Sequence, residues 1–366
     1  MVTAMKLIDR TAQEPPYLQA KKQLKELILS GKMTGRMPPE RDLTKRFRLS
    51  YMTVRRAVTE LVDEGLLYRE LGKGTFVSRA GQVVKRTGNL GFIMGPDIRH
   101  GIANAYYGQV FAGFEAAARE EGYAVFFATR PDDVLPRPAV DAPRGTMRKV
   151  DGVVGVALDH KSQALPIAKL VPLVLIDDVI KGAPVPSVHV DNARGAHDAV
   201  AHLIGLGHRR IGHIAGLRGT PVMRERLAGY RAALDEAGIA WDEALVAAGD
   251  FEFVSGRDGL DRLLALRRPP TAIFCANDTM ALGALQRAGE LGVAVPRRLS
   301  LVGFDDLDVA AQVHPPLASV GTVKTEIGRA AFAAVRDLIT GAAVADDHRI
   351  VLASRFIPRG SCAAPG

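Results

Sequence analysis

Three polar residues in the second half of the chain, Arg226, Asn277 and Asp305, have side chains that can bind a polyhydroxylated molecule. Guanidinium, amide and carboxylate groups are planar and can pair with two neighbouring hydroxyl groups at once. Each of the three lies at the end of an apolar run or at the start of a helical pattern. The alternatives are a structural ion pair between Arg226 and Asp305, and helix capping by Asn277, although Asp278 is the better capping candidate.

A sugar also has apolar faces, which bind best to an aromatic platform. Phe251 could supply one such platform, and Tyr106 or Tyr107 could supply another. Arg226 would suit a pair of sugar hydroxyls, a carboxylate or a phosphate equally well. The sequence therefore predicts a site for a small polar molecule without naming that molecule.

The patterns that support catalysis do not occur in the sequence. It contains no Gly-x-Ser-x-Gly turn, no phosphate loop ending in Gly-Lys-Ser/Thr, and no His and Cys cluster with metal-ligand spacing. Cys275 lies in an apolar run and Cys362 near the end of the chain, so the two form no disulfide framework. We therefore expect a non-enzyme with no catalytic residue, no bound metal and no cofactor.

The basic charge of the chain is confined to its first quarter. The net charge of the 366 residues is +8. Residues 1–85 hold 17 Lys and Arg against 9 Asp and Glu, which leaves 31 of the 48 basic and 31 of the 40 acidic residues for positions 86–366. This asymmetry points to a polyanion as the partner of the N-terminal part, although many basic patches bind nothing specific.

The first 80 residues are predicted to form three helices and a hairpin. Helical patterns cover 16–30, 39–47 and 50–64, and two short apolar strands cover 66–69 and 75–78. Between the strands, Gly72, Lys73 and Gly74 permit a tight turn. This order is typical of a winged helix-turn-helix, whose recognition helix enters the major groove of DNA with its N-terminal residues.

The predicted recognition helix begins with polar and basic side chains: Ser50, Tyr51, Thr53, Arg55 and Arg56. The glycine turn would let the backbone and Lys73 approach the minor groove or the phosphates. These cations also have other possible roles. Arg55 could pair with Glu60 or Asp63, and Arg56 and Lys73 could be ordinary exposed charges.

Residues 15–80 resemble the DNA-binding domain of GntR-family regulators. The resemblance is carried by five segments in the same order: residues 37–43 (MPPERDL), 49–50 (LS), 53–55 (TVR), 64–67 (EGLL) and 72–77 (GKGTFV). It implies DNA contacts from Arg41, Ser50, Thr53, Arg55 and the turn from Gly72 to Gly74. Tyr51 stands where the family often has arginine, so its hydroxyl or Arg56 would replace that contact.

From residue 89 onward the pattern alternates between apolar strands and amphipathic helices. Strands are predicted at 90–94, 124–128, 153–156, 173–176, 211–215, 272–276 and 299–303, and helices at 110–121, 193–206, 224–237, 279–291 and 325–339. Buried strands that alternate with helices indicate parallel sheets covered on both faces. About 280 residues are too many for one such sheet, so we expect a two-lobed, doubly wound α/β domain with its ligand in the crevice.

This part of the chain resembles the LacI/GalR-type effector domain, which is similar to periplasmic sugar-binding proteins. The resemblance lies in residues 150–154 (VDGVV), 188–192 (VHVDN), 206–212 (LGHRRIG), 226–230 (RLAGY), 270–278 (PTAIFCAND), 301–306 (LVGFDD), 315–317 (PPL) and 354–359 (SRFIPR). It implies an effector site of Tyr106, Tyr107, Asp159, Arg226, Phe251, Asn277 and Asp305. Asp191 is expected to cap a helix and His208 to be structural. Four prolines, Pro131, Pro136, Pro138 and Pro143, predict that a helix of the first lobe is shortened.

We therefore expect a winged helix-turn-helix head at 1–80, a linker at 81–88 and an effector-binding and dimerisation domain at 89–366. A GntR-type head on this sensor also resembles the arabinose-responsive regulators. The expected function is a homodimeric repressor of carbohydrate genes that binds a palindromic operator under the control of a sugar-type effector. The alternatives are a transport-type sugar-binding protein, and a regulator of a nucleoside or of a sugar acid or phosphate. Without a signal peptide or an apolar run of about 20 residues, a cytoplasmic, nucleoid-associated location without membrane contact is expected.

Overall fold

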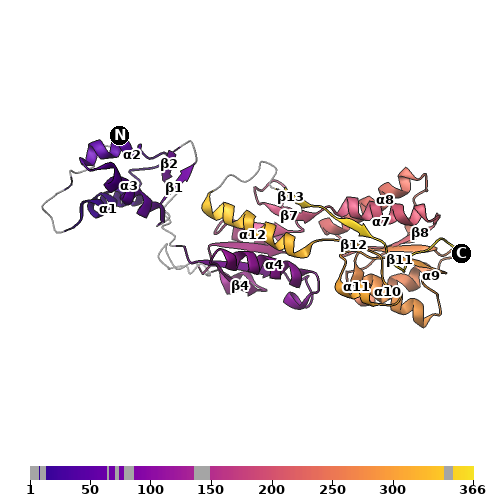
Figure 1. Cartoon of the computed structure of the whole chain (residues 1–366). Helices are drawn as coiled ribbons and strands as arrows, with labels where there is room; N and C mark the ends of the chain where they lie inside the picture. The colour runs from indigo at the N-terminus through magenta and orange to yellow at the C-terminus, as the bar shows by residue number, and fades with distance from the viewer. Residues whose placement is uncertain are drawn as a thin grey trace.

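The computed structural model describes residue 8 and residues 14–63, 66–70, 74–77, 86–135, 149–341 and 349–366. Figure 1 shows a small N-terminal head and two larger lobes that follow one another. None of the helices in these ranges is both long and apolar enough to cross a membrane.

The head contains three helices and a hairpin. They are α1 (Pro16–Leu29), α2 (Glu40–Phe47), α3 (Tyr51–Asp63), β1 (Leu67–Glu70) and β2 (Gly74–Val77), the two strands being antiparallel. The helices enclose buried apolar side chains such as Leu24, Leu43, Phe47 and Leu61. The segment before α2 joins the hairpin, because the amide of Met37 donates to the carbonyl of Thr75 at 2.8 Å. The predicted winged helix-turn-helix is confirmed.

Lobe 1 is built on a six-stranded parallel sheet. Its strand order is β13 (Arg349–Leu352), β7 (Ser187–Val190), β6 (Leu173–Ile176), β5 (Gly152–Val156), β3 (Asn89–Met94) and β4 (Ala124–Ala128). Helices α4 (Tyr107–Glu120) and α12 (Lys324–Thr340) cover one face. The short helices α5 (Pro131–Val134), η2 (His160–Ala164) and α6 (Leu165–Ala168) cover the other. The central strands are buried on both faces, as their continuous apolar runs predict.

Lobe 2 has a smaller parallel sheet of the same kind. Its strand order is β11 (Ser300–Val302), β10 (Ala272–Cys275), β8 (Ile211–Ile214) and β9 (Val246–Ala247). Helices α7 (Asn192–Gly205) and α8 (Pro221–Glu236) cover one face, and α9 (Phe253–Leu264) and α10 (Asp278–Glu290) cover the other. Shorter helices η1 (Gly101–Ala103), η3 (Glu243–Leu245) and α11 (Asp308–Gln312) complete the two lobes.

The chain passes between the lobes three times. It leaves lobe 1 between β7 and α7, returns between β12 (Ser319–Gly321) and α12, and leaves again between β13 and β14 (Arg355–Ile357). Strands β12 and β14 pair antiparallel beside lobe 2, whereas β13 pairs with β7 in lobe 1. Three neighbouring connections allow the lobes to rotate against each other while the binding edges of both sheets stay opposed.

The predicted two-lobed α/β architecture is confirmed, with the predicted strands and helices present to within about three residues at their ends. Sequence reasoning did not predict the strands β7, β9, β12, β13 and β14 or the helix α9. The proline-rich helix of lobe 1 is short, since α5 has only four residues. Pro136, Pro138 and Pro143 lie outside the described residues.

Candidate functional site

The N-terminal end of α3 presents the side chains that the sequence predicted to read DNA. The Ser50 hydroxyl caps the helix, because it accepts from the amide of Thr53 at 3.2 Å and lies 2.7 Å from the Thr53 hydroxyl. Tyr51 is 44% exposed, and the Arg55 guanidinium lies 5.9 Å from the centroid of its ring. Four predicted residues thus lie together at one end of one helix, with Arg55 exposed.

Arg56 has a different environment from its neighbour Arg55. Its guanidinium donates to Glu60 at 3.2 Å and lies 3.8 Å from the centroid of the Tyr17 ring on α1. Glu60 also accepts from Lys21 at 2.6 Å, and these two cations hold the pKa of Glu60 below its ordinary value. The pairing with Glu60 that was considered for Arg55 is therefore made by Arg56, which ties α3 to α1.

A further cation, Arg36, lies beside the hairpin turn that the sequence predicted to contact DNA. Gly72 and Lys73 lie outside the described residues, but Gly74 has φ +118°, a conformation that favours glycine. The Arg36 guanidinium lies beside Gly74, so close that a Cβ at this position would be 3.3 Å from Arg36 Nε. Arg36 is exposed and was missed by sequence reasoning, because only its pairing with β2 places it there. Arg41 is exposed on α2.

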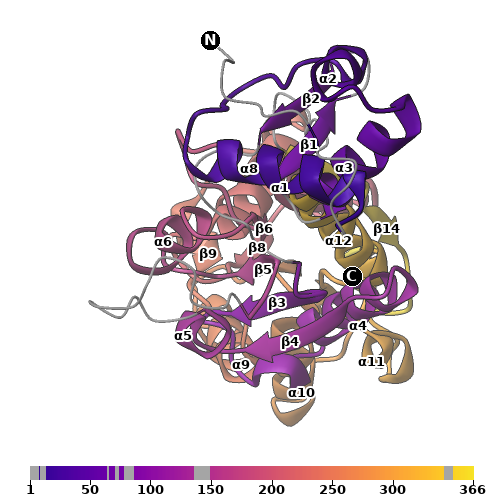
Figure 2. The same cartoon turned by 90° about the vertical axis from the view of Figure 1, so that its left-hand side faces the viewer.

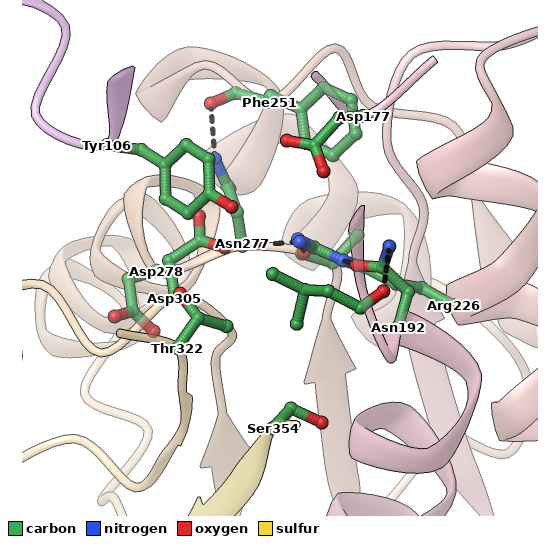
Figure 3. Close-up of polar contacts among 12 residues, drawn as sticks. Tyr106, Asp177, Asn192, Arg226, Phe251, Asn277, Asp278, Asp305, Thr322 and Ser354 are labelled. Carbon is green, nitrogen blue, oxygen red and sulfur yellow. Dashed lines mark hydrogen bonds and ion pairs between the residues drawn. The ribbon is translucent and has the colours of Figure 1, made fainter. Parts of the chain in front are cut away.

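Arg226 occupies the centre of a second polar cluster, between the two lobes (Figure 3). It projects from α8 and is only 4% exposed. Its guanidinium donates to the Asn192 side chain at 2.9 Å, to the carbonyl of Ala276, and to the Asp305 carboxylate at 3.2 Å. It also lies 3.6 Å from the centroid of the Phe304 ring. This set of contacts fixes the orientation of Arg226, and it includes the ion pair with Asp305 that the sequence offered as the alternative to a ligand contact.

Asp305 follows β11 and has φ +104°, which is unusual for a residue other than glycine. Burial raises the pKa of Asp305 above its ordinary value, although Arg226 and Lys324 oppose this shift. The Lys324 ammonium is buried and donates to the carbonyls of Asp305 at 2.7 Å, Asp306 at 3.0 Å and Thr322 at 3.4 Å. Lys324 therefore holds the strained turn that carries Asp305.

Lobe 1 contributes Tyr106, Tyr107 and Asp177 to the same site. The Tyr107 hydroxyl donates to the Asp177 carboxylate at 3.2 Å, and the two tyrosine rings meet edge to face at 4.9 Å. Tyr106 is 9% exposed, and its hydroxyl has no partner within the described part of the chain. Figure 3 shows this hydroxyl pointing into the space that Arg226 also faces. The charges of Asp177, Asp305 and Arg226 all influence the pKa of Tyr106, so both lobes meet here.

Asn277 and Phe251 lie on the lobe 2 side of the site. The Asn277 side chain accepts from the amide of Met280 at 2.9 Å and donates to the carbonyl of Phe251 at 2.9 Å. Phe251 has φ +69°, and its ring lies against Gly216, where a Cβ would be 2.1 Å from the ring. The helix cap of α10 is thus Asn277, and the prediction that Asp278 is the better capping candidate was wrong.

Asp278 is instead buried behind the site, where its carboxylate accepts from the amide of Leu307 at 2.7 Å and from the hydroxyl of Ser319 at 2.6 Å. Asp191 caps α7 as predicted, with the amide of Arg194 at 3.0 Å. His208 bonds to Thr271 at 2.8 Å, which agrees with its predicted structural role.

Asp159 bonds to the residues of its own turn and not to the other predicted effector residues in the described part of the chain. It is exposed at the end of β5, and its carboxylate accepts from the amide of Ser162 at 2.7 Å and from its hydroxyl at 2.5 Å. The structure uses it as the cap of η2. Asp177 is the residue that sequence reasoning missed, although Asp177-Asp178 follows a predicted buried strand just as Asp305-Asp306 does.

Two ion pairs and one histidine–carboxylate contact join the lobes around this site. Arg99 lies 3.6 Å from Asp250 and Arg349 lies 2.5 Å from Glu225, while the His100 ring lies 3.8 Å from the Glu252 carboxylate. These contacts indicate that the two lobes are closed on each other. The burial of the site residues agrees with a closed state, since each of the following is less than a tenth exposed: Arg226, Asp305, Asp177, Asn277 and Tyr106. A ligand can reach the buried side chains only when the lobes separate.

Asp177 gives this site a predicted pH dependence. Burial raises its pKa to about 7, with Asp305 adding to the shift and Arg226 and Tyr107 opposing it. The pKa of an aspartate in an unfolded chain is about 3.9, so between about pH 4 and pH 7 Asp177 keeps its proton in the folded chain but not in the unfolded chain. The stability that this proton supplies is fully present below about pH 3.9 and is lost as the pH rises through 7. Asp177→Asn removes this loss. Between pH 5 and pH 8, the free energy of unfolding of the natural chain should fall by about 2–3 kcal/mol relative to the variant.

Urea unfolding of both proteins at the two pH values measures this difference. Parallel pH profiles would show that Asp177 is ionised at no cost in the folded chain, and so is not desolvated between the lobes.

A winged helix-turn-helix joined to a two-lobed domain with a buried polar site defines a DNA-binding regulator that carries a sensor. Residues 16–77 match the family described as "Bacterial regulatory proteins, gntR family", and residues 200–362 match the "Periplasmic binding protein-like domain". The chain is 31% identical to the HTH-type transcriptional repressor CytR of Escherichia coli strain K12 over 355 residues, which cover 95% of this chain and 99% of CytR. The chain therefore belongs to the family of HTH-type transcriptional repressors with an effector domain, and it is a transcription regulator.

Other comparisons agree with this assignment. The chain is 33% identical to the ribose operon repressor of Haemophilus influenzae over 62% of its own length and 69% of that protein. The solved complex of the transcriptional regulator CelR with cellobiose matches 85% of this chain and 90% of that one, with 29% identity and a TM-score of 0.67. A LacI family regulator from Mycobacterium smegmatis matches 76% of this chain with 27% identity and a TM-score of 0.64.

Proposed function

We propose that the chain represses carbohydrate genes and that a sugar-type or nucleoside-type molecule bound between its lobes controls its affinity for the operator. The observation that carries this proposal is the buried interlobe site, in which Arg226 and Asp305 of lobe 2 face Tyr106 and Asp177 of lobe 1. Relatives support it, since one is named a ribose operon repressor and one solved neighbour holds cellobiose. Its domains would be the head at 1–80, the linker at 81–88 and the sensor at 89–366.

The head would bind DNA through Arg41, Ser50, Tyr51, Thr53 and Arg55, and through the hairpin turn of Gly72, Lys73 and Gly74. We add Arg36 to this set because its guanidinium lies against the hairpin at Gly74. Arg56 stays in the set only as an indirect contributor, because its contacts with Glu60 and Tyr17 are internal to the head. A repressor that acts on operator DNA would be located in the cytoplasm, with the nucleoid.

A homodimer is the oligomeric state that the surface supports. Phe126 is 48% exposed on β4, the edge strand of lobe 1, and Val254 is 63% exposed on α9 of lobe 2. Figures 1 and 2 both show β4 and α9 toward the same side of the two lobes. An exposed apolar edge strand favours pairing with a second chain. Two-fold pairing along this side would present two heads to a palindromic operator.

Binding to DNA selected from a random duplex pool tests this proposal. The affinity should fall with salt at a log–log slope of about −0.9 for each phosphate neutralised, and two chains should bind each duplex. Addition of D-ribose, D-glucose, cellobiose or adenosine should change the affinity by a factor of about 5–150 for the ligand that fits. A salt-independent affinity would contradict the operator contacts, and one chain per duplex would contradict the dimer.

The proposal leaves no catalytic role for the interlobe site. CytR, to which the chain is similar, is named a transcriptional repressor and not an enzyme, and the polar side chains of the site bond to one another rather than forming a nucleophile and base pair. The other candidate function is that of a transport-type sugar-binding protein. Failure of the head to bind DNA at low salt would favour that candidate over the repressor.

A further inference from the structure

Met52, in the first turn of α3, is the most exposed large apolar side chain in the described part of the chain, with 70% of its surface open. At 3.6 residues per turn, the buried side chains of α3 lie about 140° to 240° around the helix from Met52. These buried residues are Val54, Ala57, Val58 and Leu61. Met52 therefore points away from the core of the head, on the face with which a recognition helix enters the major groove.

The polar side chains of the same turn are engaged with one another. The Ser50 hydroxyl accepts from the Thr53 amide at 3.2 Å and lies 2.7 Å from the Thr53 hydroxyl. The Arg55 guanidinium lies 5.9 Å from the centroid of the Tyr51 ring. The side chain that this turn leaves most open to the groove is thus the apolar thioether of Met52.

The floor of the major groove carries one apolar group, the 5-methyl group of thymine. The other groups on the base edges are hydrogen-bond donors and acceptors. An apolar side chain pressed against those groups would leave them without a partner, which costs free energy. Methionine is unbranched and polarisable, so it adapts its shape to a small apolar group. The chemistry of Met52 therefore favours a T·A pair over a G·C pair at the position that it faces.

We propose that Met52 contacts the 5-methyl group of a thymine in each half-site of the operator and makes the head specific for thymine there. This inference rests on the proposed operator binding and deepens it. The cations of the head supply attraction to the phosphates and hydrogen bonds to the bases. Met52 adds discrimination at one base pair, because its side chain and the methyl group leave water together.

Deoxyuridine tests the contact directly, because it differs from thymidine only in lacking the 5-methyl group. In the operator selected from the random duplex pool, each thymine is replaced in turn, in both half-sites at once, and fluorescence anisotropy measures the affinity of the full chain. At one position the affinity should fall about 4-fold for each half-site, or about 15-fold for the pair. This is the effect of one buried methyl group per half-site.

Two variants assign the effect to a side chain. Met52→Ala should bind the thymine and the deoxyuridine duplex equally well at that position, and selection repeated with this variant should lose the preference for thymine there and keep the other positions. Leu29→Ala is the control, since Leu29 is also an exposed apolar side chain of the head but lies at the C-terminal end of α1, and this variant should keep the full deoxyuridine effect. Thermal unfolding checks that both variants fold.

Three outcomes would overturn the inference, and they are distinguishable. Full affinity of the natural chain with deoxyuridine at every position refutes the methyl contact and leaves operator binding standing. A deoxyuridine effect that persists in Met52→Ala assigns the methyl group to another side chain, such as Tyr51. Failure to select any operator from the pool contradicts the proposed function itself, and the inference falls with it.

Discussion

Replacement of Arg226 by methionine should cost about 3–5 kcal/mol in the free energy of unfolding and abolish the response of operator binding to the effector. The cost arises because Asp305, which is 6% exposed, keeps its charge but loses its ionic partner. Removal of one member of a buried ion pair leaves the other charge desolvated and uncompensated. Asn192 and the carbonyl of Ala276 lose a donor in the same step.

A second substitution distinguishes stability from recognition in this prediction. In the double variant Arg226→Met/Asp305→Asn no unpaired carboxylate is left, so at least about half of the lost stability should return, since removing both partners of a buried pair costs far less than removing one. The effector response should stay lost, because both groups contact the ligand in the proposed site. Urea unfolding and operator titration with ligand measure the two effects.

Arg231→Met on the same helix is the matched control for Arg226. Arg231 is exposed and lies 4.2 Å from the centroid of the Trp241 ring, away from any carboxylate of the site. Its loss should cost about 1 kcal/mol or less and leave the effector response intact. If Arg226→Met also cost only about 1 kcal/mol in the free energy of unfolding, another group would have to neutralise the Asp305 carboxylate, and Arg226 would not be its ionic partner in the folded chain.

The sequence predicted the architecture well because apolar runs and charge location are local signals. The continuous apolar strands of both lobes and the Ser50 cap are each visible within a few residues. The strands β12, β13 and β14 were not predicted, since each has three or four residues and only their pairing across the chain defines them. The late return of β13 to lobe 1 has no local signature at all.

The candidate sites were predictable as residue types and less so as contacts. Arg226, Asn277 and Asp305 stand out in the sequence, but their mutual bonding depends on a turn at Asp305 with positive φ that no composition rule predicts. Asp177 carried the same signal as Asp305, a carboxylate after a buried strand, and was overlooked. Neighbours Arg55 and Arg56 cannot be told apart by type, because only the packing of α1 on α3 gives one of them an internal partner.

That difference leads to the second large effect expected in this protein. Arg55→Ala should weaken binding to the selected operator about 10- to 100-fold, because its exposed guanidinium lies at the N-terminal part of the recognition helix, where a bidentate contact with a base or a phosphate is possible. Effector binding, measured by calorimetry, should be unchanged, since α3 packs mainly against α1, α2 and β1 of the head itself.

Arg56→Ala is the matched comparison one residue along the same helix. It removes a partly exposed ion pair with Glu60 and the contact with the Tyr17 ring. The loss of each contact should lower the stability of the head by about 1 kcal/mol or less, and operator affinity should change less than about 3-fold. Fluorescence anisotropy gives the affinities, and thermal unfolding gives the stability of the head. If the two variants weakened operator binding equally, the internal contacts of Arg56 would have to open on DNA, and the recognition surface would extend to the side of α3 that faces α1.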